Sequence, residues 1–364
     1  HQPLHETASL ADYRQRHAQY KADPQSRVMH AAHPLVAIWD DHESANNAWK
    51  AGAENHQSES DGDWSERRRA SLQAYYEWMP VREPESGKSL EDYWRHFSFG
   101  DLASLITLES RHSGRVEQIE YGPYVSQMKT PEDARRFIQK VVAAPGREML
   151  SSRGKAHVAD ALRDSVEAGQ PWRIIGNQVL MARTHAPLIS DELMAALNLD
   201  PASALYKDAM RFRRQGELGL PLHMDAWDGY PWAREQFYRM SRAQGAEDLL
   251  VLTGDSHAFW QNELRDERGS SMGVEIGTSG ISSPGAFADL DPKGAAAIDQ
   301  LLAEHNREVL WTEGTSNGYV RLTLTPQQAN VDYVGVNTVA ERNYLPVSLR
   351  QVQIRKDGSH LGYL

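Results

Sequence analysis

This 364-residue sequence lacks three features, and each absence excludes a class of protein. It contains no cysteine, so neither a disulfide nor a thiolate metal ligand can come from this chain. No apolar run approaches the roughly 20 residues that span a bilayer, and residues 1–20 lack the apolar core of a signal peptide. The formal charge of -11 leaves no basic stripe to neutralise phosphates. We therefore expect no membrane span and no specific nucleic-acid partner.

The chain alternates between helix-like and strand-like segments without an evident linker, and this pattern favours a single α/β domain that covers residues 1–364. The periodicity of apolar residues predicts helices at 8–23 and 64–79, and a third helix that starts after Thr130 with a proline in its first turn. Short apolar runs predict buried strands at the following residues: 35–39, 102–109, 172–182, 248–253 and 272–278. Alternating residues from 318 to 364 predict an antiparallel C-terminal meander.

One apolar run, LVAIW at 35–39, is followed at once by Asp40, Asp41, His42 and Glu43. In open α/β sheets ligands bind at the carboxyl ends of strands, where these four side chains are expected to lie. Adjacent carboxylates raise one another's pKa unless a cation offsets them, and carboxylate and imidazole groups suit hard to borderline metal ions. The pattern favours a metal site. The alternative is that Asp41 or Glu43 caps a helix while His42 packs locally.

The segment LLVLTGDSHAFW at 249–260 has the same design as the first motif. An apolar strand is followed by Gly254, and then by Asp255 and His257 with one residue between them. Two strands that end in an acid and a histidine are typical of a site assembled from loops at one edge of a sheet. The alternative is that Asp255 caps a helix beginning at Ala258 and that His257 is an ordinary surface imidazole.

Several linked motifs resemble the alkaline phosphatase D family of the metallophosphatase superfamily. They occur in the family's order over essentially the whole chain: WDDHESANNAW (39–49), YYEWMPVR (75–82), FSFGDLASLITLESR (97–111), DAWDGYP (225–231) and VLTGDSHAFW (251–260). The resemblance implies a four-layer sandwich of two mixed β-sheets flanked by helices. It also implies calcium and iron as the bound metals, and secretion or export to the periplasm.

The resemblance assigns metal ligands residue by residue. Asp41 stands where the superfamily has a metal-ligating amide, and Asp40 is expected to join it. Asp255 and His257 fill the positions of a late ligand motif, with aspartate in place of its first histidine. His42 stands at the imidazole that contacts the phosphoryl group, and is therefore the expected catalytic histidine.

Further residues are expected to contact the substrate. Arg111 could bind a substrate oxyanion as a second catalytic group, although a structural salt bridge is an equally good interpretation. Asn46, Gln178 and Trp260 are expected to line the substrate site, with Gln178 following its strand where the superfamily has a ligand or a phosphate contact.

The sequence also departs from the family. Relatives have an early segment with a metal-bridging aspartate, a tyrosine and an iron-ligating cysteine, and none of these can be identified here. The chain begins at His1 rather than at methionine, so we expect that something upstream has been removed, cleaved or left out.

The function that the resemblance implies is hydrolysis of small-molecule phosphate monoesters and diesters by a metal-activated hydroxide. Cations would clamp the phosphoryl oxygens, and His42 would stabilise them or protonate the leaving alkoxide. Two alternatives remain open: a non-catalytic domain with a structural calcium site, and another hydrolase on the same scaffold that acts on a lactone or carboxyl ester.

Overall fold

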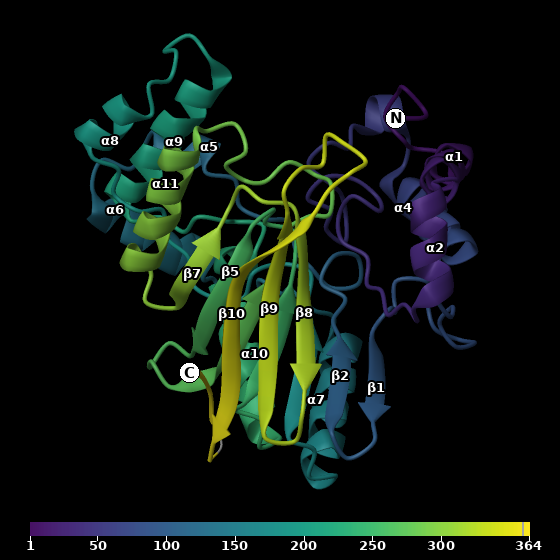
Figure 1. Cartoon of the computed structure of the whole chain (residues 1–364). Helices are drawn as coiled ribbons and strands as arrows, with labels where there is room; N and C mark the ends of the chain where they lie inside the picture. The colour runs from purple at the N-terminus through teal and green to yellow at the C-terminus, as the bar shows by residue number, and fades with distance from the viewer. Residues whose placement is uncertain (359) are drawn as a thin grey trace.

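The computed structural model describes residues 1–358 and 360–364, and these form an α/β fold around two packed sheets (Figure 1). The larger sheet has the strand order β1-β2-β3-β4-β6-β5-β7. Its strands are β1 (Arg95–Phe99), β2 (Ala103–Thr107), β3 (Trp172–Gly176), β4 (Leu249–Thr253), β5 (Phe259–Arg265), β6 (Ser271–Gly277) and β7 (Val309–Glu313). The central β2, β3, β4 and β6 run parallel, and β1, β5 and β7 are antiparallel to their neighbours. This sheet is mixed, as expected.

The smaller sheet is the predicted C-terminal meander. Its described strands, in the order β11-β10-β9-β8, are β8 (Gly318–Leu324), β9 (Gln328–Val336), β10 (Pro346–Asp357) and β11 (His360–Tyr363). All of these strands pair antiparallel, so the prediction of a second mixed sheet is wrong in this detail. Short connections join consecutive strands here, whereas a parallel pair would need a crossover of a dozen or more residues.

The described part of the chain also forms α-helices. They are α1 (Leu10–Lys21), α2 (Pro24–Ala32), α3 (Ser58–Asp61), α4 (Trp64–Trp78), α5 (Gly122–Val125), α6 (Pro131–Phe137), α7 (Ser152–Glu167), α8 (Asp191–Ala196), α9 (Ala204–Leu218), α10 (Pro231–Ala243) and α11 (Pro292–His305). A π-helical turn, η1 (Ile138–Val142), continues α6, and a 3₁₀ turn, η2 (Trp227–Gly229), precedes α10. None of the described helices is both long and apolar enough to cross a bilayer.

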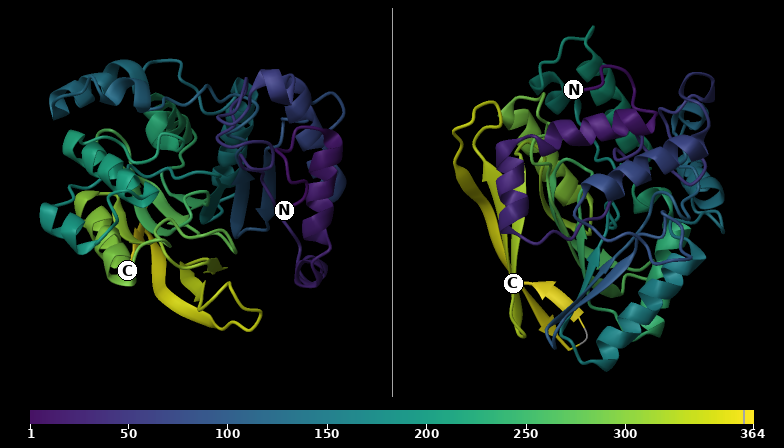
Figure 2. Two further views of the ribbon diagram at one scale, coloured as in Figure 1. Left: turned by 90° about the horizontal axis from the view of Figure 1, so that it is seen from above. Right: turned by 90° about the vertical axis from the view of Figure 1, so that its right-hand side faces the viewer.

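The larger sheet is buried on both faces, which explains its continuous apolar strands. Along β4, Leu249 and Val251 pack toward α7 and α10, while Leu250 packs against the smaller sheet. Figures 1 and 2 show the resulting layers: helices, the larger sheet and the smaller sheet. In the described part of the chain no helix covers the outer face of the smaller sheet, so the expected fourth layer is not seen there.

Most of the predicted elements are confirmed, with shorter bounds. The helix after Thr130 has the full capping box, because the Thr130 hydroxyl accepts from Asp133 N while the Asp133 carboxylate accepts from Thr130 N. The strand predicted at 35–39 does not form, and these residues belong to neither a helix nor a strand. Only Trp39 in this run is buried, stacked on Tyr93 at a ring-centroid distance of 4.5 Å. The apolar run therefore anchors a loop.

The structure also contradicts the alternative that Asp255 caps a helix beginning at Ala258. No helix starts at Ala258, and β5 begins at Phe259 instead. Phe259 and Trp260 are fully buried between neighbouring layers, so packing of large aromatic side chains decides in favour of a strand at this point.

A buried carboxyl in α11 predicts a pH dependence of stability. Burial raises the pKa of Asp299 to about 7, and its Oδ1 has no hydrogen-bond partner among the described residues. Between its ordinary pKa and this raised value, the folded protein keeps a proton that the unfolded chain has lost. Stability from this group is therefore full at low pH and is lost as pH rises through about 7.

We expect Asp299→Asn to abolish this loss. Urea unfolding at about pH 5 and about pH 8 should show the variant gaining on the parent protein as pH rises. The exposed Asp289 provides the matched control, and Asp289→Asn should leave the pH dependence unchanged. An equal difference between Asp299→Asn and the parent at both pH values would contradict the prediction.

Candidate functional site

Three carboxylates converge at the carboxyl edge of the larger sheet. One oxygen each from Asp40, Asp41 and Asp255 can be chosen so that all lie within 4.8 Å of one another. Asp255 follows the end of β4, and Asp40 and Asp41 follow the extended run at 35–39. The sequence predicts that Asp41 and the Asp255/His257 pair lie within reach of one metal ion. The structure confirms this for Asp41 and Asp255, across a separation of 214 residues (255 - 41), and does not place His257 in the group.

The turn that presents Asp255 is strained. Asp255 has φ 65° and His257 has φ 55°, both in the left-handed region that costs a non-glycine residue roughly 1–2 kcal/mol. His257 does not join the three carboxylates in the described structure. Its Nδ1 lies 2.8 Å from the Pro284 carbonyl oxygen, to which it donates when protonated. The loop between β6 and α11 therefore holds this imidazole.

Asp41 is buried, and its carboxylate shapes the turn that follows it. One oxygen accepts from His42 N and the other from Asn47 N, each at 2.8 Å. No helix follows, so this carboxylate caps an irregular turn in which Asn47 has φ 50°. Each oxygen of the Asp41 carboxylate has a second lone pair that these hydrogen bonds do not use, and this lone pair is available to a cation.

Arg111 lies at the centre of the site with a fully buried side chain. Its Nε donates to Asp40 at 2.7 Å, Nη1 donates to Asp225 at 2.8 Å, and Nη2 donates to Asp255 at 3.4 Å. This arrangement agrees with the salt-bridge interpretation of Arg111. All three nitrogens of the guanidinium group already have carboxylate partners, so none faces open solvent.

Glu109 fixes the turn from which Arg111 projects. Its buried carboxylate accepts from the backbone N–H groups of Arg111, His112 and Ser113 at 2.7–2.9 Å. The same carboxylate accepts from Trp39 Nε1 at 3.0 Å. The end of β2 is thereby tied to the residue that precedes Asp40.

Asp225 is the site residue that the sequence did not identify. It comes from the DAWDGYP segment and pairs with both Arg111 and Arg115. Although burial acts to raise its pKa, these two guanidinium groups hold the pKa of Asp225 below its ordinary value. The only sign of Asp225 in the sequence is that it begins the DAWDGYP motif. Unlike Asp40 and Asp255, it does not follow a predicted strand.

The site is short of positive charge. Four carboxylates, Asp40, Asp41, Asp225 and Asp255, face two guanidinium groups, which leaves a formal charge of -2. Burial raises the pKa of Asp255 well above its ordinary value, and the neighbouring Asp40 raises it further. Burial also raises the pKa of Asp40, against the lowering effect of Arg111. A donor set of carboxylate oxygens this close together fits a hard cation that would relieve this repulsion.

Gln178 ties three parts of the site together. Its Nε2 donates to the Trp39 carbonyl at 3.1 Å and to the Leu108 carbonyl at 3.0 Å, and its Oε1 accepts from Ser110 Oγ at 2.8 Å. Its backbone carbonyl accepts from Gly254 N at 2.9 Å. The side-chain amide is buried and engaged at both ends, so Gln178 positions the loops that hold Asp40 and Asp255.

The other residues expected to act at the site do not join the carboxylate cluster. Asn46 Nδ2 donates to Glu54 at 2.8 Å, which fastens it within the following loop. Trp260 is 2% exposed in the core and donates to Ser256 Oγ, so the structure gives it no surface for a substrate. His42 is exposed, with Nε2 at 3.8 Å from Asp41 Oδ2.

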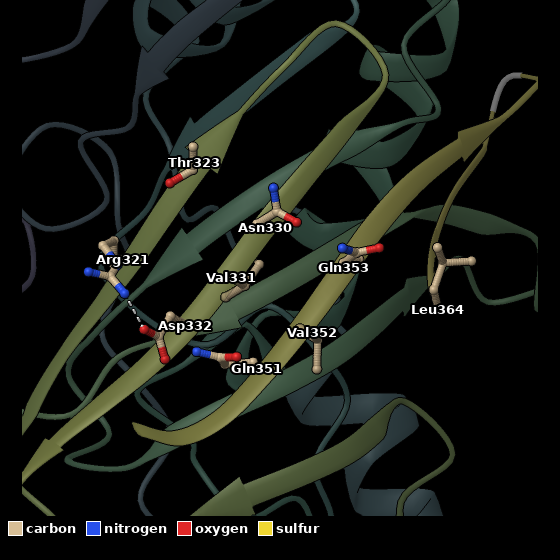
Figure 3. Close-up of a pocket in the computed structure, with 9 residues that line it drawn as sticks. All are labelled: Arg321, Thr323, Asn330, Val331, Asp332, Gln351, Val352, Gln353 and Leu364. Atoms are coloured by element: carbon tan, nitrogen blue, oxygen red, sulfur yellow. Dashed lines mark hydrogen bonds and ion pairs between the residues drawn. The ribbon is translucent and has the colours of Figure 1, made fainter. Parts of the chain in front are cut away.

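Two hollows flank the turn at 40–43. The first, of about 370 Å³, is mainly apolar and is lined by Ile38, Leu105 and Leu252 beside Asp40 and Asp255. The second, of about 440 Å³, lies on the α1 side of the turn and includes His42 and Glu43. A larger hollow of about 670 Å³ lies on the smaller sheet and contains none of the converging carboxylates (Figure 3).

Comparison with known proteins links this geometry to one family. The family described as PhoD-like phosphatase matches residues 1–333. Alkaline phosphatase D of Bacillus subtilis (strain 168) is 32% identical over 334 residues, which are 90% of this chain and 48% of that protein. A solved structure of PhoD superposes with a TM-score of 0.72 at 28% identity, covering 99% of this chain and 60% of that chain. The chain thus spans about half the length of the curated relative.

Replacing Gln178 with leucine should destabilise the fold. The substitution leaves the Trp39 and Leu108 carbonyls and the Ser110 hydroxyl without this partner in a buried region. We expect a loss of about 2–4 kcal/mol in the free energy of unfolding, because each unsatisfied buried polar group costs roughly 1–3 kcal/mol. Urea unfolding measures it. The exposed Gln15 of α1 is the control, and a Gln178→Leu variant as stable as Gln15→Leu would refute the role.

Proposed function

Because the chain belongs to the PhoD-like phosphatase family, we propose that it hydrolyses phosphate esters at the Asp40–Asp41–Asp255 cluster. The observation that supports this proposal is the convergence of three carboxylates, those of Asp40, Asp41 and Asp255, at the ligand-binding edge of the larger sheet. Phosphate-ester hydrolysis is among the slowest uncatalysed reactions, so the site must stabilise the charge that develops in the transition state, and a cation held by these carboxylates would supply that stabilisation.

Asp40, Asp41 and Asp255 are the residues that would hold the metal ion. When bound, the ion would neutralise phosphoryl oxygens and lower the pKa of the attacking water. A cluster of oxygen donors favours a hard ion such as calcium, and the family resemblance adds iron as a second candidate. We also propose that residues 1–364 act as one catalytic domain, that diesters are substrates beside monoesters, and that the protein is secreted or periplasmic.

His42 is proposed as the group that handles the proton. It is exposed beside Asp41, with no hydrogen bond to its imidazole nitrogens among the described residues, so it can turn toward a bound substrate. A protonated imidazole there would donate to a phosphoryl oxygen or to the leaving alkoxide.

Arg111 is proposed as a positioning residue. Its guanidinium group offsets the repulsion among Asp40, Asp225 and Asp255, so these side chains stay together before any cation binds. A cation that takes over Asp40 and Asp255 would leave Nε and Nη2 of Arg111 facing the reaction site, where an oxyanion could accept from them.

The proposed function is tested by phosphate release from p-nitrophenyl phosphate and bis-p-nitrophenyl phosphate, with and without a chelator. We expect release that the chelator abolishes, and that Asp255→Asn lowers by at least roughly 10²-fold because a ligand is weakened. The exposed Asp101 serves as control, and Asp101→Asn should retain activity.

The same assay separates the alternatives. Metal binding without phosphate release would indicate a structural calcium site, whereas cleavage of p-nitrophenyl acetate alone would indicate a carboxyl-ester hydrolase. Chelator-resistant phosphate release would contradict the assignment of the carboxylates as metal ligands.

Replacing His42 with alanine should lower turnover by roughly 10²–10⁴-fold, the usual contribution of a positioned acid–base group. The metal content should stay nearly unchanged, because His42 is exposed at the rim of the carboxylate cluster. Turnover measurements and elemental analysis check the two parts. His33→Ala, at another exposed histidine, is the control, and stoichiometric loss of metal from His42→Ala would make His42 a ligand.

A further inference from the structure

The hollow of about 440 Å³ on the α1 side of the turn at 40–43 has no role in the function proposed so far. Arg16, His17 and Lys21 of α1 line one side of it, and His42 and Glu43 line the other. The apolar hollow across the turn contains Asp40 and Asp255. The turn at 40–43 is therefore a wall shared by both hollows, and a ligand held at the carboxylates could extend past His42 into this second space.

The charges in this hollow are unbalanced toward the positive. Neither Arg16 nor Lys21 forms an ion pair with any described residue: Arg16 Nε donates to the Gln2 carbonyl at 2.9 Å, and Lys21 Nζ lies 3.0 Å from His30 Nε2. Glu43 is the one carboxyl among the residues that line the hollow, and its Oε2 already accepts from Asp40 N at 2.6 Å. By contrast, Arg14 on the same helix is paired with Glu77 at 2.6 Å.

Such a basic pocket is unusual for this chain, because its formal charge is -11. Partial burial lowers the pKa of Lys21 and of His17, and Lys21 lowers that of His17 further. The effect of Lys21 on His17 reflects positive charge within the hollow, which an entering anion would offset. In a cleft with low-dielectric walls, this field also concentrates anions near the opening.

We propose that Arg16 and Lys21 form a second anion subsite beside the carboxylate cluster. This proposal rests on the proposed function and specifies its substrates: phosphate esters whose alcohol part bears a second anionic group, either a carboxylate or a phosphate. The phosphoryl group undergoing hydrolysis lies at Asp40, Asp41 and Asp255, and the second anion accepts charge-assisted hydrogen bonds from the guanidinium and ammonium groups of α1.

The first experiment compares two substrates that differ only in the second anion: phenyl phosphate and 4-carboxyphenyl phosphate. The measured quantity is the ratio of kcat/KM for the carboxylated ester to that for the plain ester. In the Arg16→Gln, Lys21→Gln double variant this ratio should fall by about 10-fold or more, because charge-assisted hydrogen bonds are lost. Arg14→Gln removes the same charge from α1 outside the hollow and should keep the ratio of the parent protein.

A second experiment needs no turnover. Calorimetric titration of the metal-loaded protein with 3-phosphonopropionate and with propylphosphonate compares the same phosphonate with and without a carboxylate. We expect tighter binding of 3-phosphonopropionate to the parent protein and to Arg14→Gln, and a loss of that preference in the double variant. Circular dichroism of each variant verifies that α1 is folded.

The outcomes separate the two proposals. Hydrolysis of phenyl phosphate with a selectivity ratio that the double variant leaves unchanged would overturn the second subsite and leave the proposed function intact. No hydrolysis of either ester would overturn the proposed function, and the titration would still decide the subsite. Equal affinity of the parent protein for the two phosphonates would overturn the subsite by that measurement alone.

Discussion

The buried guanidinium group of Arg111 is the interaction on which the site depends. A charge without solvent is expensive unless every donor has a partner, and Arg111 meets this requirement with carboxylates from three distant segments. Asp40, Asp225 and Asp255 can pair with it only if their loops meet above the carboxyl ends of the parallel strands. Removing the arginine would leave Asp40 and Asp255 without this guanidinium partner, and removing one carboxylate would leave the arginine underpaired.

Two further side chains turn this electrostatic requirement into a defined geometry. Glu109 collects backbone N–H groups so that Arg111 leaves the end of β2 in one direction, and Gln178 connects that same region to the segments on either side. Both side chains form hydrogen bonds to backbone groups, and such bonds fix the path of a loop more tightly than contacts between two flexible side chains do. The strained conformations of Asp255 and His257 persist because these surrounding contacts determine the path of the chain.

The sequence predicted the fold class and the two halves of the carboxylate cluster because both depend on local patterns. Apolar runs followed by polar residues identified β4 and the turn after Trp39. Residues 35–39 nevertheless form no strand, because an apolar run that anchors a loop through one buried tryptophan looks the same in sequence as a strand. Asp225 escaped notice because nothing near it in sequence indicates charge pairing with residues about 110 positions away. The partners of Arg111 and Gln178 were inaccessible for the same reason. Long-range pairing is a property of the folded chain, and single-sequence patterns report only burial and local geometry.

An acidic protein with the proposed activity on anionic esters would face a long-range repulsion, and the distribution of its charges would resolve it. The overall charge of -11 is spread over the surface, where salt screens it within about 10 Å, whereas the charges that meet a substrate are few and local. Near the site, carboxylates concentrate where a cation would neutralise them, and the Arg16 and Lys21 side chains of α1 lie across the turn at 40–43. In the proposed function, a substrate that approached through the α1 side would meet these positive charges first, and would meet the carboxylates only where a cation lay between them and its phosphoryl group. An uncharged ester would gain nothing from either set of charges.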